Sequence, residues 1–346
     1  MRQSGAPPAR SSGFRDYGPL APKPFDFVPL AEARRRADVA GHDKFVLTKG
    51  THSGRLYYQL VALNHVFVSS GQYALSEDVG TGSGGVVRGC YRVTVDGKST
   101  PAIPGASLKG AIRSIVEAVT ASCVSVTRAD RHSFPRPESA RLCRPEALCP
   151  ACALFGTMSR LARLSFGDAT LTTGRTVLYR LPPLYRPRLG QARRVYQDTR
   201  GLYKGRKFYF HGRRVEHKRG SRVEVIPEKS VLAGSLDFEN LSDDEVGLLF
   251  FALGLDGTFR PMLGGGKPVC LGSVEFRPVA LEWLGLQDLL QYQHATQRLE
   301  AEGLKAFVAQ RVAGAQTSGL ILAPQRDRLR KILDPHNQRP APEGMY

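Results

Sequence analysis

The sequence predicts a mixed α+β fold from three observations. Residues 55–68 alternate apolar and polar side chains as a long β-strand does. Residues 107–121 space their apolar residues as an amphipathic helix does. Residues 242–255 are predicted as a second helix from Ser242 at the N-cap, acids at 243–245 in the first turn and Gly254 near the end. Short β-rich runs at 235–238 and 273–276 add further strands. The core is therefore expected to contain both strands and helices.

The turn before the first helix is a candidate anion site. It belongs to the run IPGASLKGAIR at residues 103–113, in which Pro104-Gly105 favours a turn and Ser107 a helix N-cap. Backbone N–H groups at the helix start, with Lys109 and Arg113 one turn apart on one face, suit an RNA phosphate. The alternative is an ordinary turn with two solvated cations.

The charge of the chain points to a polyanionic partner. Its 346 residues include 49 Lys+Arg and 31 Asp+Glu, a formal net charge of +18. Residues 175–222 contribute most of this, with fifteen Lys and Arg against two acids, Asp198 and Glu216. Cations mixed with aromatic side chains are typical of surfaces that bind unpaired RNA. The aromatic residues of this segment are Tyr179, Tyr185, Tyr196, Tyr203, Phe208, Tyr209 and Phe210.

The run GRKFYFHG at residues 205–212 lies near the centre of this basic segment and is predicted to form a β-hairpin arm. Arg206 and Lys207 are candidate phosphate contacts, and Tyr209 is a candidate base contact. A solvated basic insertion is the alternative. Elsewhere no apolar run reaches the length of a membrane span, and the first residues lack the apolar core of a secretory signal. A cytoplasmic protein is expected, with residues 1–24 as an unstructured arm.

Three of the six cysteines have metal-ligand spacing. Cys143, Cys149 and Cys152 follow the pattern C-x5-C-x2-C, and thiolates three residues apart can share one Zn²⁺. A structural site needs a fourth ligand, for which His132 and Cys123 are the candidates. His132 is preferred because it lies in the same Pro-rich insertion. The alternative is a loop with three reduced thiols.

Two Gly-rich loops carry further candidate residues. The loop at 69–85 holds two acids, Glu77 and Asp78, either of which could orient a nucleophile or hold a divalent ion such as Mg²⁺ near a phosphate. A solvated loop is the alternative. The second loop, whose glycines allow another backbone to approach, carries one cation and is not a Walker A loop. It consists of Gly264, Gly265, Gly266 and Lys267.

Five motifs in order resemble the RAMP superfamily, the RNA-binding backbone subunits of type III CRISPR effector complexes. The motifs are IPGASLKGAIR, CPACALFG, RLSFGDATL, FENLSDDEVGLLFFALG and GGGKPVCLGSVEF. The resemblance covers residues 53–278. The runs FDFVPL and GRKFYFHG further resemble a subfamily found in type III-D-like loci.

The resemblance implies a ferredoxin-like, RRM-type β-α-β-β-α-β core at 53–280. An N-terminal arm (1–52) would precede it, and a helical extension (281–346) would follow. Within the core, a zinc-bearing insertion (123–156) and a basic thumb-like hairpin insertion (175–230) are expected.

The resemblance also implies roles for individual residues. In the family, the positions of Lys109, Arg113 and the loop 264–267 hold the CRISPR RNA backbone, and a hairpin arm interrupts the pairing of guide and target. Some members cut target RNA with an acid that Asp78, or alternatively Glu77, would supply. The implied partners are CRISPR RNA, target RNA and other effector subunits, in antiviral defence.

Three hypotheses follow for the function. The first is a CRISPR RNA-binding effector subunit that also cleaves target RNA if the loop acid is catalytic. The second is a stand-alone endoribonuclease that processes precursor RNA, for which His65, His211 and Tyr209 are the candidate acid–base residues. The third is an RNA-binding scaffold without a CRISPR role.

Overall fold

The structure is a computed structural model that describes residues 24–37, 39, 50–79, 84–124, 130–184, 195–214, 218–283 and 297–339. The arm expected at residues 1–24 lies almost entirely outside the described residues, as do Tyr185 and Glu216. Among the described residues, no helix is long and apolar enough to cross a membrane.

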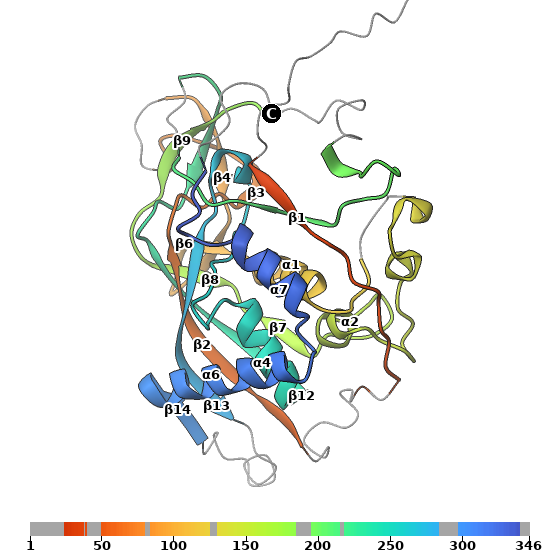
Figure 1. The fold of residues 1–346 in the computed structure, drawn as a ribbon. Coiled ribbons are helices and arrows are strands. Elements are labelled where there is room, and N and C mark those ends of the chain that lie inside the picture. Colours follow the sequence, from red (N-terminus) through yellow and green to blue (C-terminus); the bar gives the residue numbers. More distant parts are fainter. Residues whose placement is uncertain are drawn as a thin grey trace, which may run out of the picture.

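An eight-stranded antiparallel sheet forms the centre of the molecule (Figure 1). Its strand order is β14-β13-β2-β12-β8-β6-β5, and β7 also pairs with β12. The strands are β2 (Thr51–Ala62), β5 (Arg92–Val95), β6 (Lys98–Ile103), β7 (Leu164–Phe166), β8 (Ala169–Thr173), β12 (Val231–Ser242), β13 (Val274–Trp283) and β14 (Gln297–Glu300).

Three helices pack on one face of this sheet (Figure 1): α1 (Gly105–Val119), α4 (Asp243–Ala252) and α6 (Ala301–Thr317). A further helix, α7 (Ala323–Ile332), packs on α1. The chain runs β2, α1, β7 with β8, β12, α4, β13, and the matching strands lie in the order β13-β2-β12-β8. This is the split β-α-β-β-α-β arrangement of ferredoxin-like proteins. The predicted α+β, ferredoxin-like fold is confirmed.

The two core helices begin differently. Ser242 caps α4 as predicted: its side chain accepts from the Glu245 N–H, and the Glu245 side chain accepts from the Ser242 N–H. Ser107, by contrast, is not the N-cap of α1, which begins at Gly105. Asp168, in the break between β7 and β8, accepts from the Gly105 N–H at 2.8 Å. A distant carboxylate therefore caps α1 in place of a local side chain.

A second, four-stranded sheet has the order β3-β4-β11-β9. Its strands are β3 (Ser69–Leu75), β4 (Val86–Cys90), β9 (Val177–Leu181) and β11 (Ser221–Val225). The prediction of a loop throughout 69–85 was wrong for β3, whose Gly- and Ser-rich sequence becomes extended because it pairs with β4. β9 and β11 pair antiparallel, and most of the basic segment lies between them in the sequence.

The run 205–212 does not form a hairpin arm by itself. Its strand β10 (Arg206–Tyr209) pairs antiparallel with β1 (Phe25–Val28), near the N-terminal end of the described chain. Gly205 has φ +149, and a Cβ there would meet the Val28 carbonyl oxygen at 2.0 Å, so glycine permits the close approach. The basic segment is thereby fixed to the N-terminal strand.

The helical extension expected at 281–346 contains α6 and α7, although residues 297–300 form β14 before α6 begins. The end of the described chain also packs on the basic segment. The Arg339 N–H donates to the His211 carbonyl at 2.9 Å, and the Arg339 guanidinium lies 3.8 Å from the centre of the Phe210 ring.

Candidate RNA interface and metal site

Four buried cysteines come together at the base of the cysteine-rich insertion. The sulfur atoms of Cys123, Cys143, Cys149 and Cys152 all lie within 4.8 Å of one another. Cys123 Sγ is 3.6 Å from Cys152, 3.7 Å from Cys149 and 3.8 Å from Cys143. Four sulfurs about 2.3 Å from a central ion in a tetrahedron are roughly 3.8 Å apart. The cluster could therefore hold one metal ion.

Cys123 takes the place that the sequence analysis gave to His132. His132 lies on an exposed 3-10 turn and is not part of the cluster. Cys123 follows the end of α1, a core helix, and its N–H donates to Cys149 Sγ at 3.4 Å. The cluster therefore joins the cysteine-rich insertion to the end of α1, the helix that precedes it, and does not lie wholly within the insertion.

The local structure favours the thiolate form of two of the four cysteines. Cys149 is the N-cap of the short helix α2 (Pro150–Phe155), and Cys152 lies in its first turn. A hydrogen bond with Cys123 is the main cause that lowers the pKa of Cys149 to about 6, and the same partner lowers that of Cys143. Hydrogen bonds within the cluster raise the pKa values of Cys123 and Cys152. Because thiolates bind metals, Cys143 and Cys149 are the cysteines most ready to bind a cation.

Two guanidinium groups approach the cluster. Arg113 Nη2 donates to Cys152 Sγ at 3.5 Å. Burial would lower the pKa of Arg35, but its hydrogen bond with Cys143 and the negative charge of that residue raise it. Four thiolates around a divalent ion carry two net negative charges, which these arginines would compensate.

Arg113 and Arg206 share a buried carboxylate. Glu117, on α1, has a side chain only 2% exposed. It accepts from Arg113 Nε at 2.8 Å and pairs with Arg206 of β10. Arg113 also donates to the Gly156 carbonyl at 3.1 Å. Burial, and secondarily the charge of Arg113, lowers the pKa of Arg206 to about 10. Both arginines, predicted as phosphate contacts, therefore join structural elements.

Lys207 lies among aromatic rings. Its ammonium nitrogen is 4.8 Å from the ring centres of both Phe25 and Tyr209, and 5.3 Å from that of Tyr196. It donates to the Tyr209 hydroxyl at 3.0 Å and the Tyr196 hydroxyl at 3.2 Å. Burial would lower the Lys207 pKa, but the hydrogen bond to Tyr209 and the other hydroxyl contacts raise it. Tyr209 is thus engaged with Lys207.

Lys109 and Lys267 differ from these cations. Burial lowers the pKa of each ammonium group, with smaller contributions from Arg113 for Lys109 and from Lys207 for Lys267. Neither ammonium makes an ion pair or hydrogen bond with another described residue. Repulsion thus links Lys109 to Arg113, Arg206 to Arg113 and Lys267 to Lys207, and Arg206 and Lys207 are adjacent on β10. These five neighbouring cations are here called the basic strip. The basic strip consists of Lys109, Arg113, Arg206, Lys207 and Lys267.

The Gly264–Gly266 loop packs closely on the protein. Gly264 has φ +70, and a Cβ there would meet the Phe67 carbonyl oxygen at 2.2 Å. The Gly265 N–H donates to that same oxygen at 2.8 Å. A left-handed Gly266 then begins the 3-10 turn that carries Lys267. The glycines therefore allow the Phe67 backbone to approach closely, and Lys267 lies at the end of the loop. Ser107 is half-buried on the first turn of α1.

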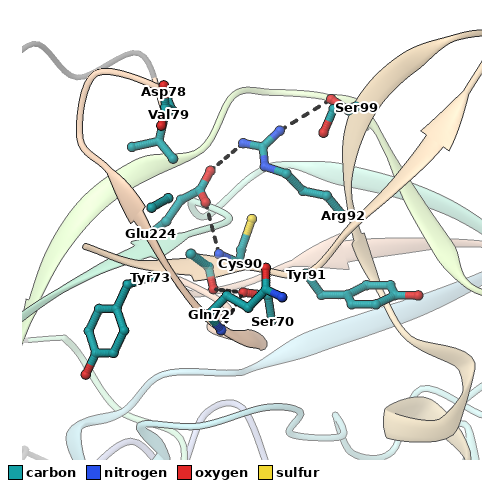
Figure 2. A pocket seen from close by; sticks show the side chains of 12 residues that line it. Ser70, Gln72, Tyr73, Asp78, Val79, Cys90, Tyr91, Arg92, Ser99 and Glu224 are labelled. Atoms are coloured by element: carbon teal, nitrogen blue, oxygen red, sulfur yellow. Dashed lines mark hydrogen bonds and ion pairs between the residues drawn. The ribbon is translucent and has the colours of Figure 1, made fainter. Parts of the chain in front are cut away.

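Asp78 lies at a hollow of about 650 Å³ bordered by β3, β4, β5 and β11. The Asp78 N–H donates to the Leu75 carbonyl at 3.1 Å, and its side chain is exposed, as is that of Glu77. Figure 2 shows Asp78 at the rim, apart from the paired Arg92 and Glu224. The loop acid is thus accessible to a ligand in the hollow.

Glu224, the other acid of this hollow, is fully engaged. It accepts from the Cys90 N–H at 2.9 Å, from Arg92 at 2.5 Å and from Thr176 at 2.6 Å. Burial would raise its pKa, but the hydrogen bonds from Thr176, the Cys90 N–H and Arg92 lower it. Glu224 therefore fixes strands together and is a poor second ligand for an ion at Asp78.

Sequence reasoning missed two acids that organise the site, Glu117 and Asp168. A third acid, Glu245, belongs to the S-x-x-E pattern at the start of α4 and also pairs with the buried Arg163 at 2.6 Å. For Glu117 a signal existed, because it stands four residues after Arg113 on the apolar face of a helix. Asp168 had no local signal, since it acts across 63 residues of sequence.

The proposed acid–base histidines are packed inside the protein. His211 is 4% exposed; one ring nitrogen lies 2.8 Å from Ser273 Oγ and the other 3.1 Å from the carbonyls of Arg260 and Leu333. Burial lowers its pKa. His65 is 5% exposed, and its Nδ1 accepts from the Glu228 N–H.

Comparison with known proteins identifies the family of the chain. A search of curated proteins gave no match. The family model of the RAMP superfamily matches residues 60–275, from β2 to β13. This range contains the core elements α1, β7, β8, β12 and α4, the four-cysteine cluster and all five cations of the basic strip. The chain therefore belongs to the RAMP superfamily, whose members are CRISPR-associated RNA-binding proteins.

Proposed function

We propose that the chain is a CRISPR RNA-binding backbone subunit of a type III, III-D-like effector complex that acts in antiviral defence. Its partners would be CRISPR RNA, target RNA and other effector subunits. The observation that carries the proposal is the basic strip, whose five cations lie on α1, β10 and the 3-10 turn at Lys267. Neighbouring cations on a ferredoxin-like core suit an RNA backbone.

Within the basic strip, Lys109 and Lys267 are the proposed phosphate contacts. Both are partly buried, and neither has a counter-ion among the described residues. A phosphate would supply the missing negative charge without breaking an existing pair. Arg113 and Arg206 are already paired with Glu117, so they would add positive electrostatic potential near the RNA without being the main phosphate contacts.

The proposed occupant of the four-cysteine cluster is one structural Zn²⁺. Cys123, Cys143, Cys149 and Cys152 provide four sulfur ligands at tetrahedral spacing, which leaves no position for a reactive water. The ion would hold the insertion against the end of α1, next to the buried helix α2.

Target cleavage is the finer part of the proposal, with Asp78 as the acid and Glu77 as the alternative. Asp78 would orient a ribose 2′-hydroxyl so that its oxygen bonds to the adjacent phosphorus while the bond to the 5′ oxygen breaks. The 2′-hydroxyl gives up its proton to water as its oxygen bonds to phosphorus, the departing 5′ oxygen takes up a proton from water, and a 2′,3′-cyclic phosphate remains. A Mg²⁺ bound at the exposed carboxylate would neutralise phosphate charge.

A stand-alone processing nuclease is less well supported. His211 has both ring nitrogens in hydrogen bonds inside the protein, and His65 accepts a backbone N–H through Nδ1. Tyr209 accepts from Lys207. None of the three combines exposure with an accessible acid–base group, which general acid–base catalysis requires.

Salt-titrated binding of a repeat-derived RNA to the full chain tests the proposal. Each lost phosphate contact should reduce the slope of log affinity against log salt by roughly one without changing sequence preference. The Lys109→Ala/Lys267→Ala double variant should therefore lose about two units. Lys305→Ala, on the exposed face of α6, is the matched control. Equal slopes for the double variant and wild type would contradict the proposed contacts.

A further inference from the structure

Two adjoining hollows open beside the basic strip. One has a volume of about 260 Å³ and the other about 480 Å³, and both are lined by Leu30 and Tyr203. Together they are here called the Tyr203 cleft. The side chains that line it include Leu30, Phe134, Arg136, Tyr203, Arg206 and Lys207. The volume of the larger hollow falls in the range of small-ligand sites.

Three segments that are distant in sequence build the Tyr203 cleft. They are the stretch after β1, the cysteine-rich insertion and the basic segment before β10. The Tyr203 N–H donates to the Ser133 carbonyl at 2.7 Å, and Lys204 N–H donates to the Tyr196 carbonyl at 3.0 Å. Figure 1 shows the green segment before β10 reaching toward the yellow insertion. The walls are therefore fixed by backbone hydrogen bonds.

One wall of the cleft is apolar and aromatic. The Tyr203 ring packs against Phe134 with centroids 5.4 Å apart and planes at 59°. Phe134 is 6% exposed, whereas Tyr203 and Leu30 are half-buried and line both hollows. A half-exposed ring supported from behind presents a flat surface on which a nucleobase can stack.

The polar side of the cleft is positive. Arg136 is exposed, and its guanidinium makes no ion pair or hydrogen bond with any residue that the structure describes. The acid that lines the cleft, Asp198, already pairs with Arg200 at 3.1 Å. The hydrogen bond from the Leu202 N–H is the main cause that lowers the Asp198 pKa. Arg136 is thus available to a phosphate.

The Tyr203 cleft is continuous with the basic strip, because Arg206 and Lys207 belong to both. An RNA backbone along the strip would therefore pass the cleft mouth. We propose that the Tyr203 cleft binds one unpaired nucleotide of the RNA, with its base on Tyr203 and Leu30 and its phosphate at Arg136. This inference rests on the proposed function and names the nucleotide site within it.

The test uses the full chain, a single-stranded RNA and a duplex of the same sequence. Tyr203→Ala should weaken single-strand binding roughly tenfold and duplex binding little, because only an unpaired base can stack. Tyr203→Phe keeps the ring and should bind like wild type. Arg136→Ala, at an exposed position, should reduce the salt slope by about one. Ultraviolet crosslinking of 4-thiouridine RNA should attach label to the peptide that contains Tyr203.

The outcomes separate this inference from the proposed function. Wild-type affinity in both Tyr203→Ala and Arg136→Ala, alongside a loss in Lys109→Ala, would overturn the cleft and leave RNA binding intact. Equal losses for single strand and duplex, not rescued in Tyr203→Phe, would assign Tyr203 a structural role and also overturn it. Protection of the cleft by a protein partner with no RNA crosslink would do the same. Absence of RNA binding in wild type would instead overturn the proposed function.

Discussion

Arg113 Nη2 lies 3.5 Å from Cys152 Sγ, so one side chain connects the four-cysteine cluster to the basic strip. The same guanidinium donates to Glu117 at 2.8 Å, and Glu117 pairs with Arg206 on β10. The cluster, α1 and β10 are thereby joined through three side chains. A change at the cluster would alter the position of cations proposed to face RNA.

Replacing Arg113 by Met should destabilise the protein by about 2–3 kcal/mol, because it leaves buried Glu117 with one partner fewer and removes the contact to Cys152. Thermal unfolding measures the change. Arg131→Met, at an exposed position, is the control and should stay within about 0.5 kcal/mol of wild type. An unchanged melting temperature with a salt slope reduced by roughly one would instead make Arg113 a direct phosphate contact.

The sequence predicted those features that short-range patterns encode. The α4 capping box is an S-x-x-E pattern with acids in the first turn, and the α1 helix follows from apolar spacing. The cap of α1 could not be predicted, because Asp168 reaches Gly105 only after β7 and β8 pair with β12. Long-range contacts of this kind depend on the assembled sheet.

The candidate site shows the same limit. Three of the four clustered cysteines were recognisable from their spacing, but Cys123 lies twenty residues before Cys143 and joins only through the end of α1. The pairing of β10 with β1 likewise has no local signal. Charge identified the basic segment, whereas the engagement of Arg206 and Lys207 inside the protein required the partners' positions.

The cluster should contain about one zinc per chain in purified protein. Cys123→Ser should remove most of it, because one of four ligands is lost, whereas His132→Ala should retain it. Elemental analysis with thermal unfolding, with and without a chelator, measures both effects. Cys270→Ser, a buried cysteine outside the cluster, is the matched control. Zinc retention in Cys123→Ser together with zinc loss in His132→Ala would restore the sequence-based assignment.

RNA binding should weaken as pH rises, and it should do so at a lower pH than if Lys109 and Lys267 had ordinary lysine pKa values. Burial lowers the pKa of Lys109 and Lys267 below the usual 10.5, so these groups lose their protons first as pH rises. RNA binds the protonated lysines, so affinity is lost as the pH rises through their lowered pKa values. Without RNA the sign reverses: the unfolded chain binds more protons in this window, and folding stability from these two groups increases with pH.

Binding measured from about pH 7 to about pH 10 tests this dependence. The Lys109→Arg/Lys267→Arg double variant keeps both charges, because guanidinium stays protonated, and should retain affinity to higher pH. If the wild type and this variant lose affinity in parallel, the two lysines are not the titrating groups.

Asp78→Ala should abolish guide-directed RNA cutting in the assembled complex while guide and target binding persist. The exposed carboxylate contributes little to affinity for a polyanion but would orient the attacking 2′-hydroxyl. Cleavage rates and RNA binding are measured together, with Glu77→Ala as the matched neighbour. Wild-type cutting by Asp78→Ala with loss in Glu77→Ala would transfer the role to Glu77. If neither change matters, this loop does not supply the catalytic acid.

The most direct test of the central claim is to sequence the RNA that co-purifies with this chain from cells that express it with its neighbouring effector genes. A CRISPR RNA-binding backbone subunit should enrich repeat-derived guide RNAs, and Lys109→Ala/Lys267→Ala should reduce that enrichment. Co-purified RNA that matches the total cellular pool, or protein that carries no RNA, would contradict the account.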